Sequence, residues 1–178
     1  SFKLYFSGEL STGTNYTAGP RKTNFNLATA GGTDYPHEWL EMGVPAPGTA
    51  PTVVGTGGTA TVSVTRIYTY TYVTATATWA EEGPPSALGT GTGKSDATWC
   101  ISAMSTGTTG KYAFTGGAKN IYRTLTDNAG NTNYQLVSQV VIATSSYNDS
   151  ISDGALGGIC PTFTPGVVNS EWVAPPSD

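Results

Sequence analysis

Charge is scarce in this sequence. Asp, Glu, Lys and Arg make up 11% of the 178 residues and leave a net charge of −4, whereas they make up about a quarter of an ordinary globular protein. No stretch concentrates Lys and Arg, so the sequence offers no basic face of the kind that binds nucleic acid. No apolar run approaches the ~20 residues of a membrane-spanning helix. We therefore expect no nucleic-acid partner and no membrane span.

Metal-ligating and thiol side chains are equally few. The chain has two cysteines, Cys100 and Cys160, and one histidine, His37, which is too few for a zinc site with the usual four ligands. We expect no metal and no cofactor. The cysteines are either two buried free thiols or an interstrand disulfide, which would constrain the unfolded chain by about 4 kcal/mol.

The sequence also lacks a convincing catalytic group. Glu81 and Glu82 are adjacent at the end of a β-prone run, where neighbouring side chains point to opposite faces, whereas glycosidases hold two carboxyls roughly 5–9.5 Å apart across a cleft. Any serine or cysteine mechanism would need His37 as its base, and we expect that residue to pack instead. We predict no catalytic residue and no enzyme: the two glutamates end a strand, and Pro84 and Pro85 carry the chain away from the sheet.

Two loop-like motifs have ordinary structural interpretations. The stretch GTGTGKS at 89–95 ends like a phosphate-binding loop, but Leu88 stands where that motif needs its first glycine and no helix follows. We predict a strand connection there. A second group of side chains carries oxygens suited to calcium but misses the spacing of a calcium loop, and is typical of turns: Asn148, Asp149, Ser152 and Asp153.

What the chain does contain is a series of β-prone runs separated by Gly, Pro and Asn. Helical periodicity is almost absent. The run at 66–79 is the longest, and about seven runs in some 110 residues predict an all-β antiparallel sandwich of the immunoglobulin or fibronectin type III kind, with an N-terminal β extension. The expected strands are 2–6, 23–29, 59–65, 66–79, 98–104, 120–124, 134–142 and 145–148.

Proline divides the chain. Three prolines fall within residues 43–51, and since proline fixes φ and cannot donate to a sheet, this segment reads as a stiff extended linker. We predict an N-terminal β segment at 1–43, a Pro-rich linker at 44–51, a sandwich at 52–162 and a C-terminal linker at 163–178.

Aromatic residues alternate in the longest run. Tyr68, Tyr70 and Tyr72 share one face of the expected strand, which is typical of a half-buried packing face. The same row is also a candidate ligand platform. With Trp79 and Trp99 it forms a possible contact surface for a receptor or glycan.

Several of these runs resemble known proteins. RIYTYTYVT at 66–74, followed by EEGPPS at 81–86, is similar to a motif of tailed-bacteriophage virion proteins that opens a fibronectin type III-like domain. NIYRT at 120–124 resembles a later strand of that family, YND at 147–149 resembles a strand end, and LEMGVPAP at 40–47 resembles its linker. Ala80 and Met42 depart from the pattern, at a usual glycine and within the linker motif.

The resemblance implies a non-catalytic structural protein of a virion, in the tail, neck or a fibre. It implies contacts with other virion proteins and with copies of the same chain in a symmetric assembly, for instance through edge strands. The family module lies inside a longer polypeptide, which agrees with a start at Ser1 rather than Met. The alternative is a receptor- or glycan-binding module of a fibre or adhesin, with a host surface glycan as partner.

Overall fold

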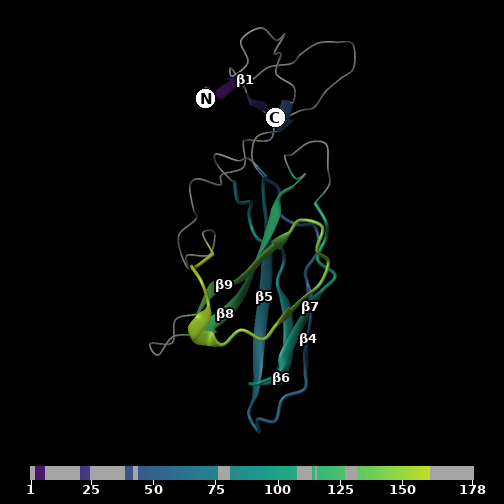
Figure 1. Ribbon diagram of the computed structural model, residues 1–178, viewed down its shortest axis with the longest axis vertical. Helices are drawn as coiled ribbons and strands as arrows, with labels where there is room; N and C mark the ends of the chain where they lie inside the picture. The colour runs from purple at the N-terminus through teal and green to yellow at the C-terminus, as the bar shows by residue number, and fades with distance from the viewer. Residues whose placement is uncertain are drawn as a thin grey trace.

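The chain is built from antiparallel β-strands (Figure 1). The computed structural model describes residues 3–6, 21–24, 39–41, 44–75, 81–107, 114, 116–126 and 132–160, the first three ranges as backbone alone. Within these ranges lie ten strands and one short 3-10 helix: β1 (Lys3–Phe6), β2 (Arg21–Asn24), β3 (Trp39–Glu41), β4 (Thr52–Thr56), β5 (Ser63–Val73), β6 (Gly89–Lys94), β7 (Thr98–Ser102), β8 (Ala118–Thr126), β9 (Thr132–Val141), β10 (Tyr147–Asp149) and η1 (Asp153–Ala155). The all-β prediction is confirmed.

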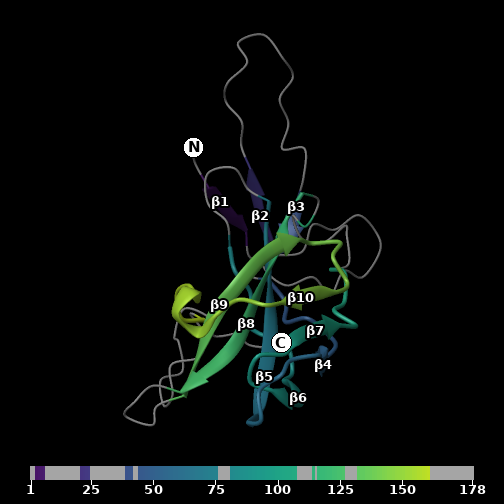
Figure 2. The same cartoon turned by 60° about the horizontal axis from the view of Figure 1, so that its bottom comes forward.

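The strands form three sheets. β1, β2 and β3 make a small sheet of their own, which is the expected N-terminal β extension (Figure 2). The other two sheets have the orders β10-β7-β4 and β6-β5-β8-β9, and every pairing is antiparallel. Residues of both sheets share one hydrophobic core, so these two sheets face each other as a sandwich. Within the described residues, no helix has the length and apolar character needed to cross a bilayer.

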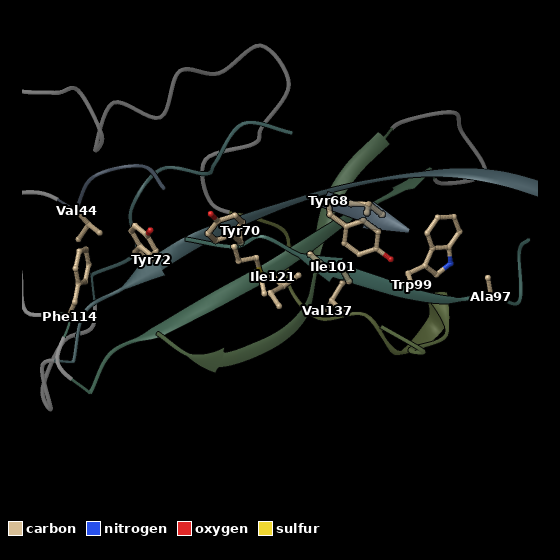
Figure 3. Close-up of a cluster of buried hydrophobic side chains, with 12 residues drawn as sticks. Val44, Tyr68, Tyr70, Tyr72, Ala97, Trp99, Ile101, Phe114, Ile121 and Val137 are labelled. Atoms are coloured by element: carbon tan, nitrogen blue, oxygen red, sulfur yellow. The ribbon is translucent and has the colours of Figure 1, made fainter. Parts of the chain in front are cut away.

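The core depends on the alternation along β5. Tyr68, Tyr70 and Tyr72 point to the opposite sheet and are 0%, 0% and 4% exposed. Trp99 and Ile101 of β7 meet them from that sheet, and both are fully buried (Figure 3). Because side chains alternate between the two faces of a strand, one row of tyrosines supplies much of the core. The packing interpretation of the tyrosine row is confirmed.

On one side of the sandwich, glycines allow β6 and β4 to approach each other closely. The glycines of β6 lie against the backbone of β4, and a Cβ on Gly91 would lie 2.7 Å from the Val53 carbonyl oxygen. A Cβ on Gly93 would lie 3.1 Å from the Cα of Gly55. The alternating GTGTG sequence is therefore a sheet strand whose bare face lets a second backbone approach. It is neither a loose connection nor a phosphate loop.

The EEGPPS segment stays with the sheet, so the prediction that its prolines lead the chain away is wrong. The Gly83 amide donates to the Tyr72 carbonyl at 2.8 Å, and the Ser86 amide donates to the Tyr70 carbonyl at 2.9 Å. Gly83 and Ser86 are three residues apart, whereas their partners Tyr72 and Tyr70 are two residues apart. The segment thus has one extra residue, as in a β-bulge. The two prolines fill the positions between, where no donor is needed. β5 itself ends at Val73, and residues 76–80 lie outside the described ranges.

The Pro-rich segment at 44–51 is packed against the sandwich. Val44 is 5% exposed and belongs to the main core. The Tyr70 hydroxyl donates to the Thr49 carbonyl at 2.9 Å. The segment carries no strand before Thr52, as expected of a linker, but its packing makes it part of the sandwich rather than a free spacer. The predicted C-terminal linker lies outside the described residues.

Replacing Gly91 by Ala tests the close approach of β4 and β6. The new methyl group would overlap the Val53 backbone, and we expect the free energy of unfolding to fall by about 1–3 kcal/mol. Urea denaturation followed by fluorescence measures the change. Gly48→Ala is the control, because a Cβ there meets no atom within 4 Å. Equal stability of the two variants would contradict the contact.

Candidate functional site: a buried arginine–aspartate network

The predicted aromatic contact surface does not exist in the described chain. Tyr68, Tyr70, Tyr72 and Trp99 are all buried between the sheets, and Trp79 lies outside the described residues. The prediction considered one strand alone, whereas the opposing sheet covers this face. Burial also removes a large apolar area from water, which favours the packed arrangement. The residues that could stack on a ligand are instead part of the core.

Two of the tyrosines use their hydroxyls to hold a loop. The Ser105 amide donates to the Tyr70 hydroxyl at 2.8 Å, and the Tyr72 hydroxyl lies 2.6 Å from the Ser105 hydroxyl. Ala103, two residues earlier, has a φ of 58°, a left-handed conformation that is costly for any residue other than glycine. The tyrosine hydroxyls therefore fix a strained loop end after β7.

The strongest polar interaction lies inside the sandwich. Arg123 of β8 and Asp149 of β10 are both 0% exposed, and their side chains lie 2.5 Å apart. The Tyr68 hydroxyl donates to the same carboxylate at 2.8 Å, and the Ile151 amide donates to it at 2.8 Å. A buried charge needs a partner and further hydrogen bonds to offset its lost hydration. Here the carboxylate has three donors, and it joins the two sheets.

The same guanidinium holds the chain that follows β10. Arg123 donates to the Ile151 carbonyl at 2.9 Å and to the Asp153 carboxylate at 2.6 Å. Arg66 reaches Asp153 at 3.3 Å, and its guanidinium carbon lies 5.3 Å from the centre of the Trp99 ring. Residues 149–153 thus wrap around one arginine, which anchors them to the four-stranded sheet.

The surroundings of Tyr68 keep its hydroxyl protonated, so that it can donate a hydrogen bond. Its pKa is raised, first by burial and then by the negative charge of Asp149 and the hydrogen bond to it. The phenol therefore stays protonated throughout the neutral range and donates to the carboxylate. The two carboxylates of this site, Asp149 and Asp153, both lie against arginine side chains.

These contacts also remove the calcium interpretation of residues 148–153. A cation would have to displace the guanidinium groups that already neutralise Asp149 and Asp153. Among the described residues, no cluster of three or more His, Cys, Asp or Glu side chains is arranged to hold a metal ion.

Glu82 has a structural task too. Its carboxylate accepts hydrogen bonds from the Thr71 hydroxyl at 2.5 Å and the Tyr122 hydroxyl at 2.6 Å. The Glu81 amide donates to the Thr74 hydroxyl at 3.0 Å. Burial and then Glu82 raise the pKa of Tyr122. Glu82 therefore pins the bulged segment to β5 and β8, which agrees with the structural interpretation of the glutamate pair.

Of the two interpretations of the cysteines, the structure excludes the disulfide. Cys100 and Cys160 are both free thiols. Cys100 is half-buried on β7, and Cys160 is fully buried beside Tyr122 and Tyr134. The interpretation without a disulfide therefore holds, although only Cys160 of the two is fully buried. His37 lies outside the described residues.

The interior of the sandwich also contains a buried lysine. Lys119 is 0% exposed, donates to the Thr144 carbonyl at 2.5 Å and lies 5.8 Å from the centre of the Tyr70 ring. Burial lowers the pKa of Lys119 to about 8. The ammonium group thus occupies a site that favours the neutral amine.

Nearly all the charge of the sandwich is engaged internally. Residues 44–160 contain nine charged side chains that the structure describes, and three of these are exposed: Lys94, Asp96 and Asp153. Lys94 donates to the Gly58 carbonyl, Asp96 accepts the Thr59 and Ala60 amides, and Asp153 accepts from two arginines. Each of the three exposed charges that the structure describes here is therefore bound to the protein itself.

Comparison with known proteins adds no relative. No protein-family model matches the chain, and neither the curated proteins nor the solved structures contain a match.

Removing the charge of Asp149 tests the network. Asp149→Asn leaves the Arg123 cation buried against a neutral amide, and we expect the free energy of unfolding to fall by about 3–5 kcal/mol. Asp153→Asn is the matched control: its side chain is 55% exposed, so we expect a loss of no more than about 1 kcal/mol. Urea denaturation measures both. Similar losses in the two variants would contradict a special role for the buried pair.

The lowered pKa of Lys119 predicts that the free energy of unfolding rises with pH. The folded pKa is about 8 and the unfolded value about 10.4, so between pH 8 and 10 the unfolded chain binds more protons and stability increases. We expect a gain of roughly 2 kcal/mol over this range. Lys119→Met should abolish it, whereas Lys94→Met, at an exposed site, should keep it. A rise that survives in Lys119→Met would contradict the assignment.

Proposed function

We propose that this chain is a non-catalytic structural module of a bacteriophage particle, in the tail, neck or a fibre. Its partners are other virion proteins and further copies of itself, and its location is the extracellular particle. It uses no cofactor and binds no nucleic acid.

One observation carries the proposal: every exposed charge that the structure describes on the sandwich is hydrogen-bonded to the protein itself. Exposed charges normally keep proteins apart in solution and protect sheet edges from pairing. In this sandwich, the charged groups that the structure describes are bound to the protein's own backbone and side chains. Depletion of charged residues is typical of the buried core of interfaces, so a surface with little charge suits permanent contact with neighbouring subunits.

The strand order supports an immunoglobulin- or fibronectin-like fold. Taken in chain order, β5, β6, β8 and β9 give a sheet ordered β6-β5-β8-β9, the arrangement of the strands C′, C, F and G in such sandwiches. β4 beside β7 occupies the positions of B and E. β10 departs from the pattern, because it follows β9 in the chain but lies where a D strand would pair with E.

The motif residues behave as structural residues, which also favours a module without catalysis. Arg123 and Asp149, from two of the phage-like motifs, form the buried ion pair. Glu82 and Ser86, from a third, hold the bulged segment on β5. The resemblance therefore rests on residues that build a fold. The alternative of a glycan-binding module loses its aromatic platform, since Tyr70 and Trp99 are buried.

Mass spectrometry of purified particles tests the proposal. We expect peptides of this chain in phage virions from its source, at a copy number that stays fixed through density-gradient purification. An abundant host protein followed through the same gradient is the control, because a contaminant should be progressively lost. Absence of the chain from particles, or its loss along with the control, would overturn the proposal.

A further inference from the structure

The last described segment of the chain pairs with the edge of β9. We name residues 157–160 the terminal arm. The Leu136 amide donates to the Gly158 carbonyl at 2.9 Å, and the Gly157 amide donates to the Leu136 carbonyl at 2.8 Å. The Cys160 amide donates to the Tyr134 carbonyl at 2.8 Å. The arm therefore supplies backbone partners to one half of an edge strand.

Apart from a bulge where the register shifts between Leu136 and Ser138, the β9 strand has no protection of its own against edge pairing. β9 has the sequence TNYQLVSQVV, ten residues without a charge or a proline. Natural sheets usually protect such an edge with lysine, proline, an inward charge or a covering segment. Among the described residues, the arm is the segment that covers Tyr134–Leu136. Farther along β9, Val141 is 68% exposed.

The contacts that hold the arm on β9 are separate from the Arg123 contacts that hold the residues before it. Arg123 holds the chain through Asp153, and in both views η1 lies beside β8 and β9 (Figures 1 and 2). Gly154, Gly157 and Gly158 follow, and a Cβ on Gly154 or Gly158 would meet no atom within 4 Å. Glycine gives such a segment wide backbone freedom. The arm can therefore leave β9 while the buried ion pair stays intact.

If the arm leaves β9, the backbone and apolar groups that it covered need new partners of the same kind. Cys160 is fully buried in a cluster with Tyr122 and Tyr134, and Leu136 packs against that cluster. Departure of the arm exposes this apolar strip and leaves the Leu136 amide without its partner. An identical arm from another copy satisfies every one of these groups, because the contacts are those already made within one chain.

We propose that the arm and the β9 edge form an exchange pair: the arm of one copy docks on β9 of a second copy. The inference rests on the proposed function, since an assembly holds copies at the high local concentration that favours exchange. Such an exchange gives a contact between subunits without requiring a new surface.

Cysteine cross-linking distinguishes the two arrangements. Gln135 and Ile159 form a β-bridge, so Gln135→Cys with Ile159→Cys, in a Cys100→Ser background, places two thiols opposite each other. The chain is unfolded and refolded at increasing concentration, oxidised, and separated without reductant. We expect disulfide-linked dimers and higher species that increase with concentration. Both variants also carry Cys160→Ser, so that no further thiol remains in the arm; the control keeps Gln135→Cys with Cys100→Ser but retains Ile159, and should give no such ladder.

A second pair guards against a variant that fails to fold. Leu136→Cys with Gly158→Cys uses residues joined by a backbone hydrogen bond, and a side chain at 158 has open space. Cross-links confined to single chains at every concentration, with both pairs, would overturn the exchange. That result would leave the proposed function standing, because the proposed function is tested by the presence of the chain in virions.

Discussion

The buried Arg123–Asp149 pair is the interaction on which the rest of the fold depends. The two side chains are fully buried at 2.5 Å, so each would be costly without the other. Their requirement for partners draws in Tyr68 from β5 and the Ile151 amide. One ion pair thus connects β8 of the four-stranded sheet to β10 of the opposite sheet, and fixes the direction of the chain beyond β10.

A second consequence concerns the surface. Charges that are buried or paired with opposite charges contribute little to repulsion between copies. Lys94 and Asp96 hold the loops at one end of the sandwich, and Asp153 pairs with two arginines. Three of the described charges are exposed, as are apolar residues such as Val62 and Val141, and a surface with so little charge favours association over a free monomer. The low charge content of the sequence is thereby linked to the proposed role.

Local patterns in the sequence predict some of these features and miss others. The alternation of Tyr68, Tyr70 and Tyr72 predicts their shared face, since it depends on one strand alone. Whether that face is buried depends on the opposing sheet, so the predicted contact surface was wrong. The Arg123–Asp149 contact joins residues 26 positions apart in different sheets, and no local pattern reveals such a pairing. The EEGPPS bulge was missed for a similar reason: its prolines exclude ordinary pairing, but only the register of β5 shows that the chain returns.

Native-state hydrogen exchange would test the central claim most directly. If the buried pair makes both sheets and residues 149–153 one cooperative unit, the Ile151 amide, which donates to Asp149, should open only with global unfolding, like the central amides of β5. The Leu136 amide, which is bonded only to the terminal arm, should open at a clearly lower free energy. An Ile151 amide that exchanges as readily as the Leu136 amide, while β5 stays protected, would contradict the claim.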